Sequence, residues 1–136
     1  MTNKEKEVYA FLKKSRLYEA EIDLIKKQIE SLERIEFVDT KKHIEDLNIR
    51  IKKMQIARLL ISQAISKFPN ADSRMIYNCR YVLSLSWKQV GYETWMTSRN
   101  AKYIHDKSFP SFVKFFEEVM QNEGIEADYI VATISI

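Results

Sequence analysis

Residues 86–109 read SWKQVGYETWMTSRNAKYIHDKSF, and this stretch decides the fold that the sequence predicts. Ser86 and Thr97 each precede a run with helical periodicity, and a hydroxyl in that position can accept a hydrogen bond from a free amide of the first helical turn. Two short amphipathic helices are therefore expected, joined by a turn around residues 94–96. Gly91 falls where two such helices cross closely, so the spacing predicts a helix-turn-helix.

The second of these helices has an apolar face and a polar face. Ala101, Ile104 and Phe109 fall on the inner side at helical spacing. An arginine on the outer side can bridge two acceptors on guanine, and lysines can hold phosphates. The candidate DNA-binding residues are Lys88, Thr97, Ser98, Arg99, Asn100, Lys102, Tyr103 and Lys107. Many pairs of buried helices share this pattern, so the spacing alone leaves a purely structural role open.

Residues 80–91 and 97–109 together resemble the region-four helix-turn-helix of bacterial sigma factors. The resemblance is to the form found in small phage-encoded regulators of late genes, the ArpU- and RinA-like group. It implies transcriptional regulation in a phage or a related mobile element. It also implies that Thr97 caps the recognition helix and that Arg80 and Lys88 touch phosphate. The DNA-facing positions that it implies are Ser98, Arg99, Lys102 and Tyr103.

The chain departs from that group in several places. Residues 93–96 read Glu-Thr-Trp-Met, where the group usually has an apolar residue, a glycine and a small or apolar residue. Pro110 is expected to end the recognition helix, so residues 111–121 would form a separate last helix. Trp95 would either plug the core or lie at the DNA backbone. His105 is expected near the exposed edge of the recognition helix.

Apolar residues repeat at alternating steps of three and four through residues 1–68. The first seam comprises Val8, Phe11, Tyr18, Ile22, Ile25, Ile29 and Leu32, and the second comprises Ile44, Leu47, Ile51, Met54, Ile61, Ile65 and Phe68. Asp39 or Thr40 is the expected N-cap of the second helix, and each helix would have about 28 to 33 residues. An antiparallel, coiled-coil-like hairpin fits this pattern, and so does one continuous helix in a parallel dimer. Either arrangement would serve as a spacer or a homodimerisation arm.

The predicted fold class is all-α, with a long N-terminal helical hairpin, a sigma-region-four-like helix-turn-helix domain and a short C-terminal tail. The expected boundaries are 1–68, 69–121 and 122–136, because Pro69 ends the second long helix. Residues 129–136 are rich in β-branched side chains and would either add as a strand to a partner or be disordered. Apolar residues off the seams predict packing on the second half or self-association: Leu17, Leu24, Ile49, Ile56, Leu59 and Leu60.

Composition excludes several classes of protein. Two glycines and two prolines in 136 residues cannot supply the many tight turns of an all-β fold or a glycine-rich phosphate loop. One cysteine and two histidines exclude an internal disulfide and a zinc cluster. Charges interrupt every apolar run, and the N-terminus has no apolar signal core. We therefore expect a cytoplasmic protein that is not an enzyme, with no cofactor, no metal and no membrane contact.

Charge is distributed unevenly along the second half of the chain. Residues 74–114 carry seven basic and two acidic side chains, whereas residues 115–136 carry five acidic and no basic ones. A basic block of this kind favours a polyanionic partner, although small domains also show such unevenness by chance.

Three functions fit these observations. The first is a DNA-binding transcriptional regulator whose arm dimerises or contacts RNA polymerase. The second is a phage packaging adaptor similar to a small terminase subunit, which would form a ring. The third is an inhibitor derived from a helix-turn-helix that binds a host protein. We favour the first, in which a helix starting at Ser98 enters the major groove of double-stranded DNA, Arg99 reads a base, and Lys88, Lys102 and Lys107 anchor the backbone.

Overall fold

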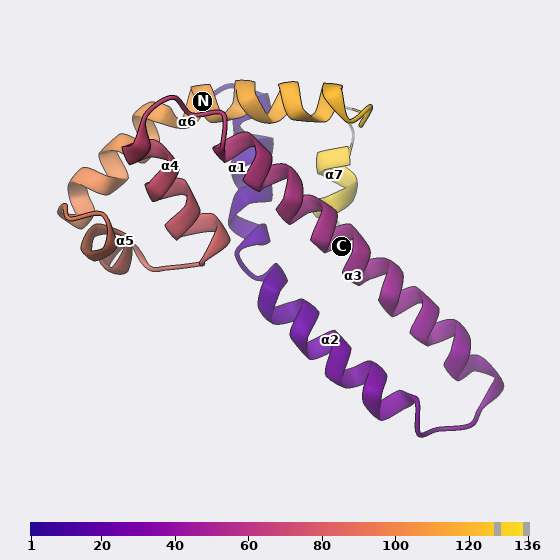
Figure 1. The fold of residues 1–136 in the computed structure, drawn as a ribbon. Helices are drawn as coiled ribbons and strands as arrows, with labels where there is room; N and C mark the ends of the chain where they lie inside the picture. The colour runs from indigo at the N-terminus through magenta and orange to yellow at the C-terminus, as the bar shows by residue number, and fades with distance from the viewer. Residues whose placement is uncertain (127–128, 135–136) are drawn as a thin grey trace.

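A computed structural model describes residues 1–126 and 129–134, and every regular element in these residues is helical (Figure 1). The all-α prediction is thus confirmed. The elements are α1 (Asn3–Ser15), α2 (Tyr18–Leu32), α3 (Val38–Ile65), α4 (Ala71–Tyr77), the π-helix η1 (Asn78–Val82), α5 (Trp87–Glu93), α6 (Ser98–Asn122) and α7 (Tyr129–Ile134). Within the described residues, no helix is long and apolar enough to cross a membrane.

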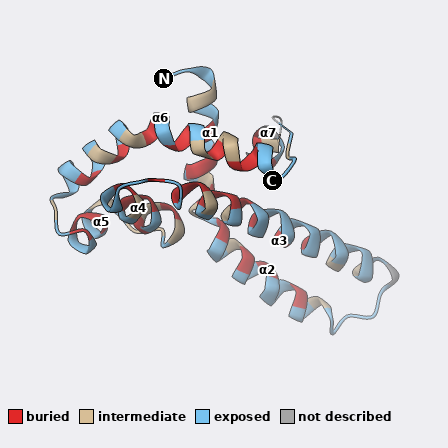
Figure 2. Cartoon of the chain, turned by 45° about the horizontal axis from the view of Figure 1, so that its top comes forward, coloured by how far each residue is buried: buried red, intermediate tan, exposed pale blue. Residues whose placement is uncertain are grey.

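The helices form a body from which α2 and the facing part of α3 extend (Figure 1, Figure 2). Aromatic side chains dominate the core of that body. The ring centroids of Phe68 and Tyr77 are 4.9 Å apart, those of Tyr77 and Phe112 are 5.2 Å apart, and those of Phe11 and Phe116 are 5.4 Å apart. These rings come from α1, α4, α6 and the segment that follows α3, so one continuous core joins the two halves of the sequence. Phe112 and Phe116 are fully buried in this core.

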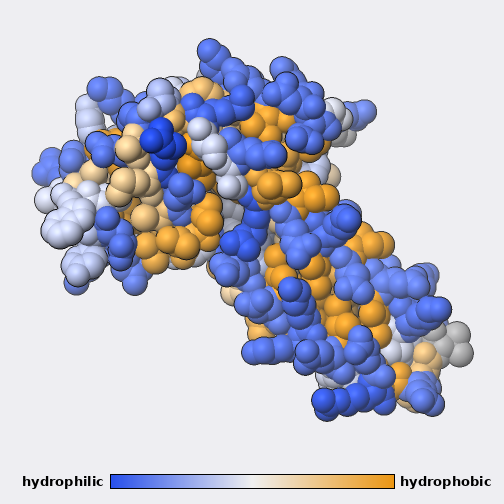
Figure 3. All heavy atoms as spheres, viewed as in Figure 1, coloured by the Kyte–Doolittle hydropathy of each residue, from blue (hydrophilic) through white to orange (hydrophobic). Residues whose placement is uncertain are grey.

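The extended part consists of α2 and α3 lying side by side, with the chain reversing direction between them (Figure 1). Apolar side chains fill the space between the two helices (Figure 3). The buried residues of this seam include Ile22, Ile25, Ile29, Leu47 and Ile51. Because a non-helical segment over residues 33–37 separates α2 from α3, the alternative of one continuous helix is wrong.

The predicted N-cap of the second long helix is also wrong. Helix α3 begins at Val38, one residue before Asp39, and its N-cap is Phe37, which makes no side-chain capping bond. Asp39 and Thr40 therefore lie inside the first turn. The carboxylate of Asp39 still suits this position, because the N-terminal end of a helix dipole favours negative charge.

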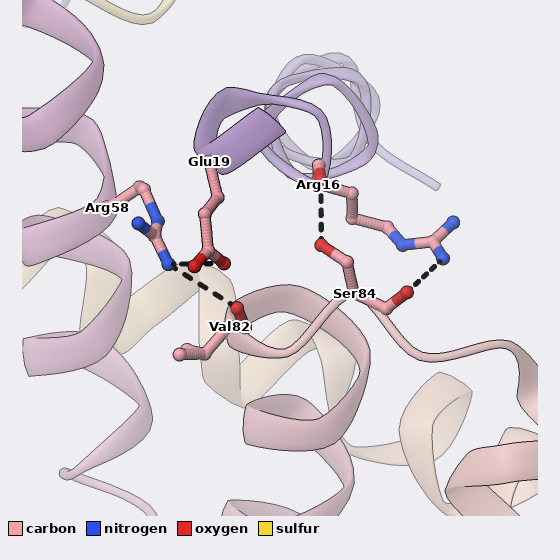
Figure 4. Close-up of polar contacts among 5 residues, drawn as sticks. All are labelled: Arg16, Glu19, Arg58, Val82 and Ser84. Carbon is pink, nitrogen blue, oxygen red and sulfur yellow. Dashed lines mark hydrogen bonds and ion pairs between the residues drawn. The ribbon is translucent and has the colours of Figure 1, made fainter. Parts of the chain in front are cut away.

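The first seam does not lie on one continuous helix, because the chain breaks between α1 and α2 at Arg16. The hydroxyl of Ser15 donates to the Leu12 carbonyl at 2.7 Å, and the hydroxyl of Ser84 donates to the Arg16 carbonyl at 2.7 Å (Figure 4). The second bond gives the Arg16 carbonyl a partner outside its own helix. A residue 68 positions away thus stabilises the chain at the break.

Helix α6 runs through Pro110, so the expected end of the helix at this proline is wrong. The expected separate helix over residues 111–121 is instead the second half of α6. A proline ring removes one amide donor and clashes with the carbonyl four residues earlier, so a helix that tolerates it bends. Pro110 and Asp106 are both exposed, which lets water satisfy the freed carbonyl. Figure 1 shows α6 curving over the body.

The end of the chain is helical as far as the structure describes it. Tyr129–Ile134 forms α7, in which Ile130 and Thr133 are buried, and this helix packs against α1. The predictions of an added strand or disorder are therefore wrong for these six residues. Residues 135–136 of the predicted segment lie outside the described part of the chain.

Candidate nucleic-acid interface

The α5–α6 unit, residues 86–109, begins each of its helices with a local hydrogen-bonded cap. The Ser86 hydroxyl accepts from the Gln89 amide at 3.2 Å, and the Gln89 side chain accepts from the Ser86 amide at 2.9 Å. The Thr97 hydroxyl accepts from the Asn100 amide at 3.1 Å. Both predicted caps are confirmed. Each cap fixes the first turn of its helix and so defines where the turn between them must lie.

Gly91 is the point of closest approach between α5 and the turn that follows. A Cβ atom at this position would lie 2.7 Å from the Met96 carbonyl oxygen and 2.9 Å from the Ser98 amide nitrogen. Both neighbours are backbone atoms, so no side-chain rotation could relieve the clash. Val90 and Ala101 are fully buried where the two helices face each other. The backbone of the turn and of the start of α6 therefore lies directly against Gly91.

All eight candidate DNA-binding residues are exposed. The side chains concerned are Lys88 on α5, Thr97 at the cap, and Ser98, Arg99, Asn100, Lys102, Tyr103 and Lys107 on the first three turns of α6. Arg99, Lys102 and Tyr103 share one face of α6, because residues three and four apart are neighbours on a helix. Asp106 also lies on this face, and its carboxylate is held by the ring of His105 at 2.8 Å. The face is thus basic overall with one acidic group near its end.

Arg80, for which the resemblance implies a phosphate contact, is half-buried and hydrogen-bonded within the chain. Its guanidinium donates to the Leu85 carbonyl at 3.0 Å and lies 4.7 Å from the centre of the Trp87 ring. Burial, and secondarily the neighbouring charge of Arg16, lowers the pKa of Arg80. The side chain is therefore committed to holding the segment before α5.

His105 is buried, with 2% of its surface exposed, so its expected place at the edge of the recognition helix is wrong. Its Nε2 lies 2.6 Å from the Tyr81 hydroxyl oxygen, and its ring stacks on Tyr77 with centroids 4.8 Å apart. Burial lowers the pKa of His105, against the opposing effect of its hydrogen bond with Asp106. A neutral imidazole thus ties α6 to η1 and α4. Tyr77 and Tyr81 are partners that the sequence pattern alone did not identify.

Two arginines from the first half of the chain fix the segment that leads into α5 (Figure 4). Arg16 donates to the carbonyls of Arg80, Ser84 and Leu85 at 3.1, 3.2 and 3.3 Å. Arg58 contacts the Val82 carbonyl at 3.5 Å and the Glu19 carboxylate at 3.4 Å. Since Ser84 has a φ of 57°, an unusual conformation for a residue with a side chain, these contacts hold a strained connection in place.

Trp95 does not plug the core, because 95% of its surface is exposed. It occupies the turn between α5 and α6 with a φ of 59°. This left-handed conformation costs on the order of 1 kcal/mol for a residue other than glycine. The stretch 93–96, whose sequence departs from the resembled group, thus contains a residue with a strained backbone.

The described residues include no group of three or more His, Cys, Asp or Glu side chains that could hold a metal ion. Cys79 is a free, buried cysteine. Comparison with protein-family models, with curated proteins and with solved structures finds no match to this chain. The features of this chain that bear on its function are therefore the geometry of the α5–α6 unit and the residues that the unit exposes.

Proposed function

We propose that this protein is a sequence-specific DNA-binding transcriptional regulator of a phage or mobile element, acting in the cytoplasm of the host cell. The observation that carries the proposal is the backbone contact at Gly91. Two capped helices flank a short turn, and the turn approaches Gly91 too closely to admit a side chain there, which is compatible with a helix-turn-helix. The helix-turn-helix domain would follow a helical hairpin formed by α2 and α3.

The proposed contacts follow from what α6 exposes near its N-terminus. Arg99 would donate to two acceptors of guanine in the major groove, a pairing worth about 1–3 kcal/mol of base discrimination. Lys88, Lys102 and Lys107 would contact phosphates on either side of that groove, which gives affinity without sequence preference. Thr97 and Ser98 would bring the amide end of α6 close to the backbone, where a helix favours an anion.

The α2–α3 pair would dimerise or contact RNA polymerase. Apolar side chains lie on its surface outside the seam between the two helices, at Leu24, Ile49, Ile56 and Leu59. Exposed apolar side chains gathered on an extended element are typical of an interaction surface. A dimer would also give two recognition helices, as operators with paired half-sites require.

The test is binding of double-stranded DNA by the purified protein and by the Arg99→Ala/Lys102→Ala double variant. Both side chains are exposed, so the variant should unfold at the wild-type temperature and keep its helical circular dichroism. We expect affinity for a selected site to fall on the order of a hundredfold in the variant. Added salt should lower the DNA affinity of the wild-type protein more steeply than that of the variant, because the variant has lost a phosphate contact. Equal affinity of the two proteins for every duplex would contradict the proposal.

A further inference from the structure

The turn between α5 and α6 presents an aromatic side chain that the fold does not use. Trp95 is 95% exposed and stands in a left-handed conformation with φ 59°. Glycine or asparagine would adopt this backbone with less strain. The indole makes almost no packing contacts within the chain although its backbone is strained. This combination indicates contact with something outside the chain.

A second aromatic side chain lies beside it. Tyr92, on the last turn of α5, is 82% exposed, and together with Trp95 it lines a shallow hollow of about 550 Å³ whose other lining residues are Gly91, Glu93, Met96 and Thr97. Thr97 is the cap of α6, so the hollow adjoins the end of the helix proposed to enter the groove. Tyr103, the third exposed aromatic residue of the unit, lies further along α6.

The charges around this hollow indicate which ligand suits it. Lys88 lies one turn before Tyr92 on α5 and lines a neighbouring hollow with it, and Arg99 lies on the first turn of α6. Glu93 lines the hollow itself and would repel a phosphate placed there. The hollow therefore suits an uncharged, partly apolar part of a ligand, and the nearby cations suit anionic groups on either side of that part. The deoxyribose between successive phosphates of a duplex has that chemistry.

We propose that Trp95, supported by Tyr92, packs against a deoxyribose of the DNA backbone beside the groove entered by α6. This inference rests on the proposed DNA-binding function and adds an apolar contact to its polar ones. An indole face against a sugar excludes water from both surfaces and depends little on base sequence. Trp95 therefore contributes affinity for any duplex, whereas Arg99 contributes discrimination between sequences.

The experiment compares the wild-type chain with Trp95→Gly and Trp95→Asn, using a 20-base-pair duplex of mixed sequence at low salt. We expect each variant to bind about tenfold more weakly, in line with the loss of one aromatic contact to a nucleic acid. Thermal stability should rise or stay level, because both replacements accept φ 59° more readily than tryptophan. Phe37→Ala is the matched control, since Phe37 is also highly exposed but lies at the far end of the α2–α3 pair.

Fluorescence gives a second readout that does not depend on a variant folding. The duplex should shift the tryptophan emission to the blue and protect it from acrylamide, because Trp95 is the far more exposed of the two tryptophans. Wild-type affinity in both variants, with binding still lost in Arg99→Ala/Lys102→Ala, would overturn this inference and leave the proposed function standing. Absence of any duplex binding by the wild-type chain would overturn both.

Discussion

The α5–α6 unit and the α2–α3 pair expose opposite kinds of side chain. The α5–α6 unit presents cations and aromatic rings, among them Arg99, Lys102 and Trp95, on helices whose ends are fixed by local caps. The α2–α3 pair presents aliphatic side chains such as Leu24 and Ile49 outside its own seam. The first surface suits a charged ligand and the second an apolar partner. In the proposed function, the first surface would bind a polyanion and the second a protein.

The two regions also differ in what holds them to the body. The α5–α6 unit is attached through hydrogen bonds from Arg16 and through the buried ring of His105. The α2–α3 pair continues directly from the aromatic core through the end of α3. Substitutions of Arg16 or His105 should therefore disturb stability and the proposed DNA binding together, whereas substitutions of exposed apolar residues of the pair, such as Leu24, should leave the unit intact.

The largest effect is expected from Gly91→Ala. Its Cβ would lie 2.7 Å from a backbone oxygen, so α5 and the turn must move apart, at a cost of about 3 kcal/mol or more in the free energy of unfolding. Urea denaturation checks this value. Gly124→Ala is the control, because Gly124 has φ 67° but no atom within 4 Å of the added Cβ, and its cost should be about 1 kcal/mol. Equal costs for the two variants would show that α5 does not approach the turn as described.

The next effect is expected from Arg16→Ala. This variant removes three donors to carbonyls around the strained Ser84 segment, and we expect a loss of about 2 kcal/mol in stability. Arg58→Ala is the matched comparison, since its contacts are longer and more exposed, and it should cost less than about 1 kcal/mol. Thermal unfolding of both variants measures the difference. The reverse order would mean that Arg58, and not Arg16, holds the segment.

A pH effect of intermediate size should originate at His105. Burial lowers its pKa in the folded protein below the ordinary value of 6.5, so the unfolded chain takes up a proton at higher pH than the folded chain. The neutral imidazole therefore makes its full contribution to the free energy of unfolding above pH 6.5. This contribution is lost as the pH falls below 6.5, by at most about 1.4 kcal/mol per pH unit. Urea denaturation between pH 7.5 and 5.5 should show this slope. His105→Gln should flatten it, whereas His43→Gln, at an exposed site, should retain it.

The smallest effect is expected from Leu24→Gln combined with Ile56→Gln. Both side chains are exposed, so unfolding free energy should change by less than about 0.5 kcal/mol. Affinity for a duplex with a single site should stay within about twofold of wild type, because neither residue belongs to the α5–α6 unit. Sedimentation velocity of the same variant should show less self-association than the wild-type chain if the pair dimerises. A large loss of single-site affinity would contradict the separation of the two surfaces.

The sequence predicts best where local chemistry decides the structure. Ser86 and Thr97 act as caps through bonds to residues three positions ahead, and Gly91 is required by the turn that immediately follows it. In each case the residue and the structural feature that it determines lie within a few positions of each other in the sequence. The exposure of all eight candidate residues follows from the same periodicity.

Prediction from the sequence fails where contacts between distant residues determine the structure. The break after α1 is stabilised by Ser84, and the burial of His105 depends on Tyr81 from another helix. Helix α6 continues through Pro110 because aromatic packing on both sides of the proline outweighs one lost hydrogen bond. The periodicity of a helix alone does not distinguish a solvent-exposed histidine from a buried histidine that contacts tyrosines. Such contacts span tens of residues and leave no local pattern.

The most direct test of the account is selection of fragments from the DNA of the source genome by the purified protein, with Arg99→Ala/Lys102→Ala in parallel. The account predicts enrichment of one or a few sites, loss of that enrichment in the variant, and weakening by salt. A folded, helical protein that enriches no fragment, or that enriches the same fragments after both substitutions, would contradict it.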